Sequence, residues 1–208
     1  MTTERLEPFR QALVELRRRL RDGGLAPGDR VTAKDIADGL KLSPTPVREA
    51  LSRLAGEGLL EEHRGDGFFV PELSAADVTV LYRMSEQLLL ISQGATRALQ
   101  RDARISEATP GEDPIVAVER VFLGWVSESS SRVTIEAYRT VAIRLAAVRR
   151  CEPQLIAGLD AEADALLRLA DPSCRRQRAA AIQAFHRRRL ALAEPLARLL
   201  EPLPSDRG

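Results

Sequence analysis

Histidine, cysteine and aromatic residues are scarce in this chain of 208 residues, which has two His, two Cys and 4% aromatic side chains. Cys151 and Cys174 are too few for a disulfide framework and lack the spacing of a zinc site, so we expect free thiols. The shortage of aromatics leaves the core to Leu, Ala, Val and Ile, which favours helices. Because no nucleophile motif, phosphate loop or metal cluster is visible, the sequence predicts that the protein is not an enzyme.

Long apolar runs and a strong net charge are also lacking. No apolar run approaches the roughly 18–20 residues of a membrane span, and the first residues lack the basic and apolar regions of a signal peptide. We therefore expect a cytoplasmic protein with no membrane partner. The net charge is +1, and residues 1–71 contain twelve Lys or Arg and twelve Asp or Glu. Any nucleic-acid surface must come from the placement of charge and not from its total.

The stretch 42–54 predicts a short helix with one apolar and one polar face. Ser43 suits the N-cap and Pro44 suits the first helical position. Apolar residues recur at helical spacing and should face a core: Val47, Ala50, Leu51 and Leu54. The other side carries hydroxyls and an arginine: Thr45, Arg48 and Ser52. This is what a reader of the DNA major groove needs, although the pattern alone also fits a surface helix with solvated charges.

The flanking residues predict a winged helix-turn-helix. Thr32-Ala33-Lys34-Asp35 has the spacing of a capping box and opens a short helix over 33–40, close before the helix at 43. Residues 59–70 predict a hairpin with the turn Arg64-Gly65-Asp66-Gly67. A hairpin in this place is a wing. Arg64 at its tip is placed to reach phosphate or the minor groove, and the alternative is a solvated turn residue.

A set of residues spread over 9–71 carries a family resemblance. Its members are Pro27-Gly28, Ile36-Ala37, Leu40, Ser43, Thr45 to Leu51, Leu54, Glu57-Gly58-Leu59, Gly67 and Phe69-Val70. On these residues the stretch resembles the winged-helix domain of GntR-type bacterial transcription regulators. The resemblance implies DNA contacts by a basic residue early in the second helix, by the start of the recognition helix and by a wing glycine: Lys34, Ser43, Thr45, Arg48 and Gly65. The chain departs from the family at Pro44, where members usually have a base-reading arginine.

The remainder of the chain, 73–208, predicts an all-helical bundle. It contains no recognisable strand and is rich in Ala, Leu and Arg. Helices are expected from about 74 to 101 and near 113–129, 132–151, 154–170 and 173–201. The predicted fold is thus mostly α. It has a winged helix-turn-helix domain with a small β-hairpin wing over 1–72 and a helical effector-binding and dimerisation domain over 73–208.

A helical domain after a GntR-type winged helix resembles the FadR branch with its FCD-type effector domain. The resemblance rests on this architecture, on Leu81-Tyr82 and on Phe185-His186. Many FCD domains hold a metal with one Asp and three His, but only His186 has a counterpart here, and Ser85 replaces the usual arginine on the first bundle helix. We therefore expect no metal and no other cofactor.

Polar residues of the helical domain are candidates to line an effector pocket: Ser85, Ser92, Thr96, Tyr138, Arg144, Gln183 and His186. Each also has a structural alternative. A helical hydroxyl can bond the carbonyl of the preceding turn, and His186, followed by three arginines, fits a residue that faces water.

Together these features predict a dimeric transcription regulator, a repressor, that binds a short palindromic DNA operator under the control of a small-molecule ligand. Two alternatives stay open. The helical domain could be a degenerate bundle without a ligand. The neutral first domain and Pro44 also fit a protein–protein interaction module that has lost operator binding.

Overall fold

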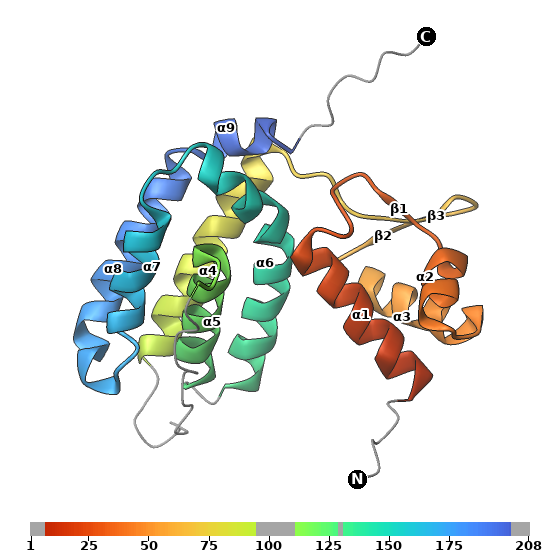
Figure 1. The fold of residues 1–208 in the computed structure, drawn as a ribbon, viewed down its shortest axis with the longest axis horizontal. Coiled ribbons are helices and arrows are strands. Elements are labelled where there is room, and N and C mark those ends of the chain that lie inside the picture. Colours follow the sequence, from red (N-terminus) through yellow and green to blue (C-terminus); the bar gives the residue numbers. More distant parts are fainter. Residues whose placement is uncertain (1–6, 95–110, 129–130, 201–208) are drawn as a thin grey trace. The chain divides into compact units, whose positions relative to one another are not determined.

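The computed structural model describes residues 7–94, 111–128 and 131–200. The chain divides into two compact units, Met1–Leu73 and Ser74–Gly208, one residue beyond the boundary expected from the sequence. Figure 1 shows the elements of both. Within the described ranges, none of the helices combines the length and the apolar character needed to cross a membrane.

The first unit is a winged helix-turn-helix, which confirms the predicted fold class. Its helices are α1 (Pro8–Asp22), α2 (Ala33–Leu40) and α3 (Pro44–Gly56). Its strands are β1 (Arg30–Val31), β2 (Glu61–His63) and β3 (Gly67–Phe69). They form an antiparallel sheet in the order β1-β3-β2, with Phe69 of β3 between Arg30 and Glu61.

Local signals in the sequence set the ends of α2. The backbone N–H of Asp35 donates to the Thr32 side chain at 3.2 Å, and the two side chains are hydrogen bonded at 2.6 Å. The Thr32 side chain is thus the N-cap expected from the capping-box spacing, and the Asp35 side chain bonds the Thr32 hydroxyl. The helix ends at Lys41, which has a left-handed backbone conformation, and the next residues lead directly into α3. The predicted start of α3 is confirmed, although the side chain of Ser43 makes no capping hydrogen bond.

The core of the first unit forms where α3 packs on α1 and α2. The apolar side of α3 is completely buried, with Val47, Ala50, Leu51 and Leu54 at 0% exposure. Ala12 and Leu16 of α1 and Ile36 of α2 complete it. Each fully buried Leu or Ile contributes about 1.5–3 kcal/mol, so this core fixes which side of α3 faces solvent.

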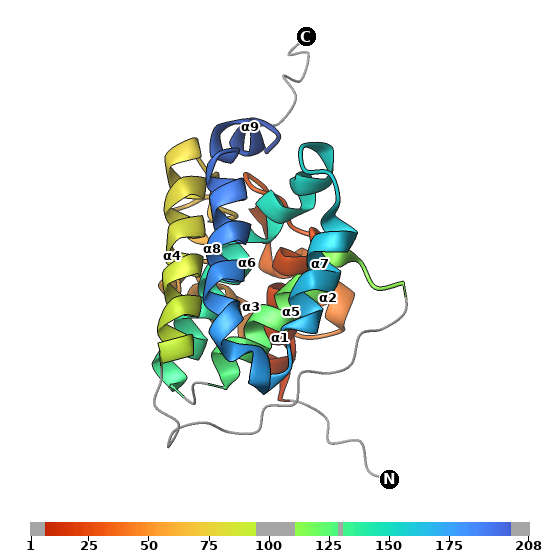
Figure 2. The same ribbon diagram turned by 90° about the vertical axis from the view of Figure 1, so that its left-hand side faces the viewer.

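The second unit is a helical bundle, as predicted. Its elements are α4 (Ala75–Gly94), α5 (Pro114–Ser127), α6 (Arg132–Cys151), α7 (Leu159–Arg168), α8 (Arg175–Leu190) and α9 (Ala193–Arg198), with 3-10 turns at Glu152–Gln154 and Pro172–Cys174. Helix α4 packs against α5, α6, α8 and α9, and α5 packs against α6 and α7. Figure 2 shows α4 and α8 side by side.

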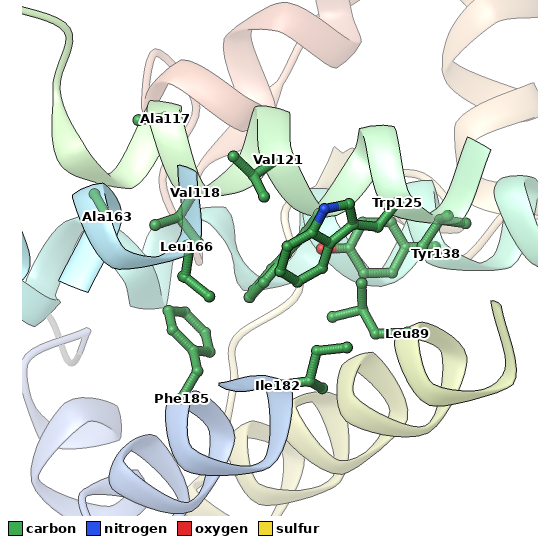
Figure 3. Close-up of a cluster of buried hydrophobic side chains, with 12 residues drawn as sticks. Leu89, Ala117, Val118, Val121, Trp125, Tyr138, Ala163, Leu166, Ile182 and Phe185 are labelled. Atoms are coloured by element: carbon green, nitrogen blue, oxygen red, sulfur yellow. The ribbon is translucent and has the colours of Figure 1, made fainter. Parts of the chain in front are cut away.

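Aromatic rings fill the centre of this bundle. Trp125 of α5 is fully buried, and Figure 3 shows it among Leu89 of α4 and Ile182 of α8. The rings of Phe122 and Phe185 meet edge to face with centroids 4.9 Å apart. Such pairs add about 0.5–1.5 kcal/mol to the burial of their area, which joins α5 to α8.

Two predicted helices of the bundle differ from the structure. The helix expected over 173–201 is two helices, α8 and α9, because Pro195 is tolerated in the first turn of a helix but not in its interior. The helix expected over 154–170 begins only at Leu159, after Gly158 with a φ of 74°. The expected end of the first bundle helix near 101 lies outside the described residues.

Candidate nucleic-acid interface and buried polar cluster

One side of α3 is polar and faces solvent. Thr45, Arg48 and Ser52 are exposed, as is Ser43 at the N-cap. The Ser43 hydroxyl is not used for capping, so it is available to a partner. Pro44 and Pro46 remove two of the N–H groups that the start of a helix leaves unpaired. Contacts at this end of α3 therefore depend on side chains.

Three neighbouring arginines of α1 are ion-paired with carboxylates of the same unit. Arg18 and Arg19 bind Glu15 at 2.8 and 2.7 Å, and Arg17 binds Glu57, the C-cap residue of α3, at 2.5 Å. The hydrogen bonds from Arg18 and Arg19 hold the pKa of Glu15 at about 2. A large share of the basic residues in this unit is thus cancelled inside the fold.

Unlike these arginines of α1, the cations nearest the start of α3 and the wing tip are not ion-paired with any described residue. In the described parts of the chain they are exposed and form no ion pair: Lys34, Lys41, Arg48 and Arg64. They come from α2, the α2–α3 connection, α3 and the wing. Residues 1–71 contain equal numbers of basic and acidic side chains, but these four unpaired cations lie on the elements that a winged helix presents to DNA.

The wing turn holds Arg64 and Gly65 at its tip. Gly65 has a φ of 87°, a left-handed conformation that favours glycine, and a Cβ there would meet no atom within 4 Å. Its requirement for glycine is therefore conformational. The Arg30 Nε donates to the carbonyl of Asp66 at 2.8 Å and braces the turn against β1.

His186 is the centre of a buried polar chain in the second unit. Its Nδ1 lies 2.7 Å from the carbonyl oxygen of Ile182 and its Nε2 lies 3.0 Å from the Ser85 hydroxyl. A carbonyl only accepts, so Nδ1 carries the proton and Nε2 accepts from Ser85. Tyr138 is buried and interacts with Ser85, and burial raises the pKa of its hydroxyl. Burial lowers the pKa of His186 to about 4, and the ring is neutral at pH 7.

A buried ion cluster lies one helical turn further along α8. The Arg189 guanidinium donates to both carboxylate oxygens of Glu152, at 3.0 and 2.8 Å, and to those of Glu162, at 3.1 and 2.7 Å. Its carbon lies 3.3 Å from the centre of the Phe185 ring. The Tyr82 hydroxyl donates to Glu152 at 2.8 Å. Arg189 and Glu152 are each 1% exposed, so these charges are compensated inside the fold.

Arg149 of α6 is the least satisfied member of this cluster. It is 4% exposed, and its ion pairs are long, 3.5 Å to Glu119 and 3.9 Å to Glu152. Its Nε is buried and has no hydrogen-bond partner among the described residues. Burial opposes its charge, but the nearby carboxylates outweigh that effect and raise the pKa of Arg149.

The structure brings together only part of the predicted effector pocket. Ser85, Tyr138 and His186 meet, so the alternative in which His186 faces water is wrong. The Ser92 hydroxyl donates to the Leu89 carbonyl at 2.6 Å, which is its structural alternative. Gln183 is exposed. Thr96 lies outside the described residues. Arg144 is half-buried, and its Nε has no partner among the described residues.

The sequence did not predict the buried ion cluster next to His186. Its members are Tyr82, Arg149, Glu152, Glu162 and Arg189. Arg189 does fall on the inward stripe of the last predicted helix, which is a signal for burial. The two carboxylates come from a 3-10 turn and from α7, and nothing in their own spacing links them.

The residues present do not fit the metal site that the FCD resemblance implies. Both nitrogens of His186 are already hydrogen bonded. The carboxylates of Glu152 and Glu162 are bound to Arg189. In the described ranges no group of three His, Cys, Asp or Glu side chains comes together in a way that could hold a metal ion.

The winged helix with an exposed polar recognition helix defines the class of the protein, a helix-turn-helix transcription regulator. The family model "Bacterial regulatory proteins, gntR family" matches residues 9–70. The chain is 31% identical over 121 residues to an uncharacterized HTH-type transcriptional regulator from the TAR-I ttuE-ttuC' intergenic region of Agrobacterium vitis. That match covers 54% of this chain and 68% of the relative. The chain therefore belongs to the GntR family of bacterial regulatory proteins.

Other curated relatives match over less than half of their own length. The Nta operon transcriptional regulator of Aminobacter aminovorans is 38% identical over 98 residues, which is 47% of this chain and 41% of the relative. The chain spans less than half the length of three of the curated relatives that it matches. The solved structure of E. coli McbR/YncC covers 90% of this chain and 99% of its own, with a TM-score of 0.63 and 21% identity. This likeness shows the shared fold.

Proposed function

We propose that this GntR-family regulator binds a specific double-stranded DNA operator through α3 and the wing. The observation that carries the proposal is the division of α3. Val47 and Leu51 are completely buried, while Thr45 and Arg48 are exposed on the other side. An exposed arginine in the first two turns of a recognition helix suits a bidentate contact with guanine.

The other predicted contacts assist this binding. Lys34 and Arg64 bind phosphates, Ser43 and Ser52 donate hydroxyl hydrogen bonds, and Gly65 lets the wing backbone approach the DNA. Phosphate contacts fix the orientation of the domain and carry no sequence information. Because Pro44 has no donor, the base that an arginine reads in other family members is not read from this position.

We further propose that the regulator is a repressor and acts as a homodimer on a short palindrome. A two-fold dimer places two recognition helices on symmetric half-sites. The second unit is proposed to be an FCD-type domain that supplies the dimer contact and the ligand response.

The ligand is a small molecule bound near the buried polar chain of Ser85, Tyr138 and His186, without a metal. The Nε of Arg149, whose charge acts on Tyr138 and His186, supports the proposal. It is buried and forms a long ion pair with Glu152 but no hydrogen bond among the described residues, so it has hydrogen-bonding capacity left for a ligand. The ligand acts by binding one conformation of the dimer better than another and so changes the DNA-competent population.

Selection of bound sequences from random duplex DNA tests operator binding directly. The proposal expects one enriched sequence with dyad symmetry, bound by the full chain in a gel shift. If no sequence is enriched, the protein is not an operator-binding regulator. If the chain binds no operator but forms a complex with another protein that does not depend on salt, the result favours the interaction module.

Thermal unfolding across a panel of small metabolites tests the ligand site. A true ligand raises the melting temperature in proportion to the logarithm of its concentration above Kd. It also changes operator affinity in the gel shift. A panel with no stabilising compound favours the bundle without a ligand.

A further inference from the structure

Lys41 has a backbone conformation that lysine rarely adopts. With a φ of 56° it is the one non-glycine residue with positive φ among the described residues. The N–H of Leu42 donates to the Ala37 carbonyl at 3.0 Å, and that of Lys41 donates to Asp38. This helix ending needs a left-handed residue, where glycine is commonest, because a Cβ makes that conformation costly. The chain thus has a strained lysine where glycine fits without strain.

The Lys41 side chain has no partner inside the fold. It is exposed, and it forms no hydrogen bond or ion pair with another described residue. Its charge does lie at the C-terminal end of α2, where the helix dipole favours a cation. That effect changes folding stability and has no influence on a DNA partner. A strained residue without internal contacts indicates a role outside the fold.

The position of Lys41 indicates what that role is. Lys41 is two residues before Ser43, within about 7 Å of it along the chain. In helix-turn-helix proteins the first helix crosses the DNA backbone while the second helix enters the groove, and Lys41 joins the two helices. An ammonium group is a compact point charge that suits a phosphate. At the start of α3 itself, Pro44 has no donor to offer.

We propose that Lys41 binds a DNA phosphate beside the start of α3 and holds that end of the helix in the groove, where Pro44 makes no contact. The inference rests on the proposed DNA binding and adds a positioning residue to it. The phosphate contact carries no base information, so it strengthens the selected operator and unrelated DNA alike.

The test compares Lys41→Gly and Lys41→Arg with the wild-type full chain. Arg18→Ala, an exposed and already ion-paired arginine of α1, is the control for loss of one positive charge. Fluorescence anisotropy measures Kd for the selected duplex and for a scrambled duplex between about 50 and 200 mM salt. For each half-site, Lys41→Gly should weaken binding to both duplexes by about three- to tenfold and reduce the slope of log K against log salt by about 0.9. Lys41→Arg and Arg18→Ala should bind close to wild type.

Folding is monitored in the same variants. Lys41→Gly should melt no lower than the wild type, because glycine relieves the left-handed strain. If Lys41→Gly binds both duplexes as tightly as the wild type, the inference is overturned. A loss of affinity for the selected duplex alone also overturns it, because a phosphate contact acts on both. If the wild type itself binds neither duplex in a salt-dependent way, the proposed DNA binding has failed, which separates the two claims.

Discussion

The two units of this chain contain two contrasting sets of charged residues. In the unit Met1–Leu73, Arg48 and Lys34 are exposed and have no ion pair in the described part of the chain. In the unit Ser74–Gly208, Arg178 and Arg189 are 0% and 1% exposed and are bound to carboxylates and carbonyls. A buried charge must be paired, so the pairs made by Arg178 and Arg189 are part of the folded structure. The first set has no partner within the fold and is available to an anionic partner outside it.

The largest expected effect is on the buried set. Arg189→Met leaves the carboxylates of Glu152 and Glu162 without their guanidinium, so the free energy of unfolding should fall by about 3–5 kcal/mol. Denaturant unfolding followed by circular dichroism measures it. Arg187→Met, at the exposed neighbour on α8, should stay within about 0.5 kcal/mol of wild type. Similar small losses in both variants would contradict the assignment of Arg189 to the fold.

The next effect is a pH dependence from His186. Its pKa in the folded protein, about 4, lies below the value near 6.5 of an unfolded chain, so the unfolded state takes up the proton first as the pH falls. The ring therefore contributes stability above pH 6.5 that is lost between about pH 6.5 and 4, up to roughly 3 kcal/mol.

Unfolding free energies across that pH range check this expectation. His186→Gln should remove most of the dependence between pH 6.5 and 5, while His63→Gln on the exposed wing should leave it unchanged. An identical pH profile in wild type and His186→Gln contradicts a neutral, buried ring.

A smaller effect, on operator affinity, is expected from the exposed cation Arg48. Arg48→Ala removes the proposed guanine contact and should cost about 1–3 kcal/mol of operator affinity for each half-site. Its unfolding free energy should stay within about 0.5 kcal/mol of wild type, because Arg48 has no partner in the fold. Gel-shift titration and thermal unfolding of the same preparation separate the two. If Arg48→Ala binds the operator as tightly as the wild type, Arg48 does not make the proposed guanine contact.

The smallest effect distinguishes two helix starts. Thr32 caps α2 through its side chain, so Thr32→Ala should cost about 1 kcal/mol of stability. Ser43 occupies the same place on α3 without a capping hydrogen bond, so Ser43→Ala should cost less than about 0.5 kcal/mol. Ser43→Ala should instead weaken operator binding. Equal stability losses in the two variants would mean that Ser43 caps its helix after all.

The first unit could be predicted closely from the sequence because its signals are local. The capping box at Thr32 and the proline at position 44 set the starts of α2 and α3, and apolar spacing chose their buried sides. In the bundle the same kind of local signal was overlooked at Pro195, in the first turn of α9, and at Gly158, the N-cap of α7.

The buried cluster could be predicted only in part. Ser85 and Tyr138 were candidates because they are polar residues on inward faces. The pairing of Arg189 with Glu152 and Glu162 depends on how α7, α8 and the 3-10 turn pack, and a single sequence does not contain that information. Burial also decided the state of His186, whose three following arginines had suggested water.

The central claim is that the placement of unpaired cations, and not total charge, creates a DNA-binding surface. Two triple-alanine variants of equal charge test it most directly. One removes Lys34, Arg48 and Arg64, and the other removes the ion-paired Arg17, Arg18 and Arg19 of α1. Anisotropy titration of the selected operator should show a loss of about a hundredfold or more in the first variant and less than about tenfold in the second. Equal losses in both would contradict the claim.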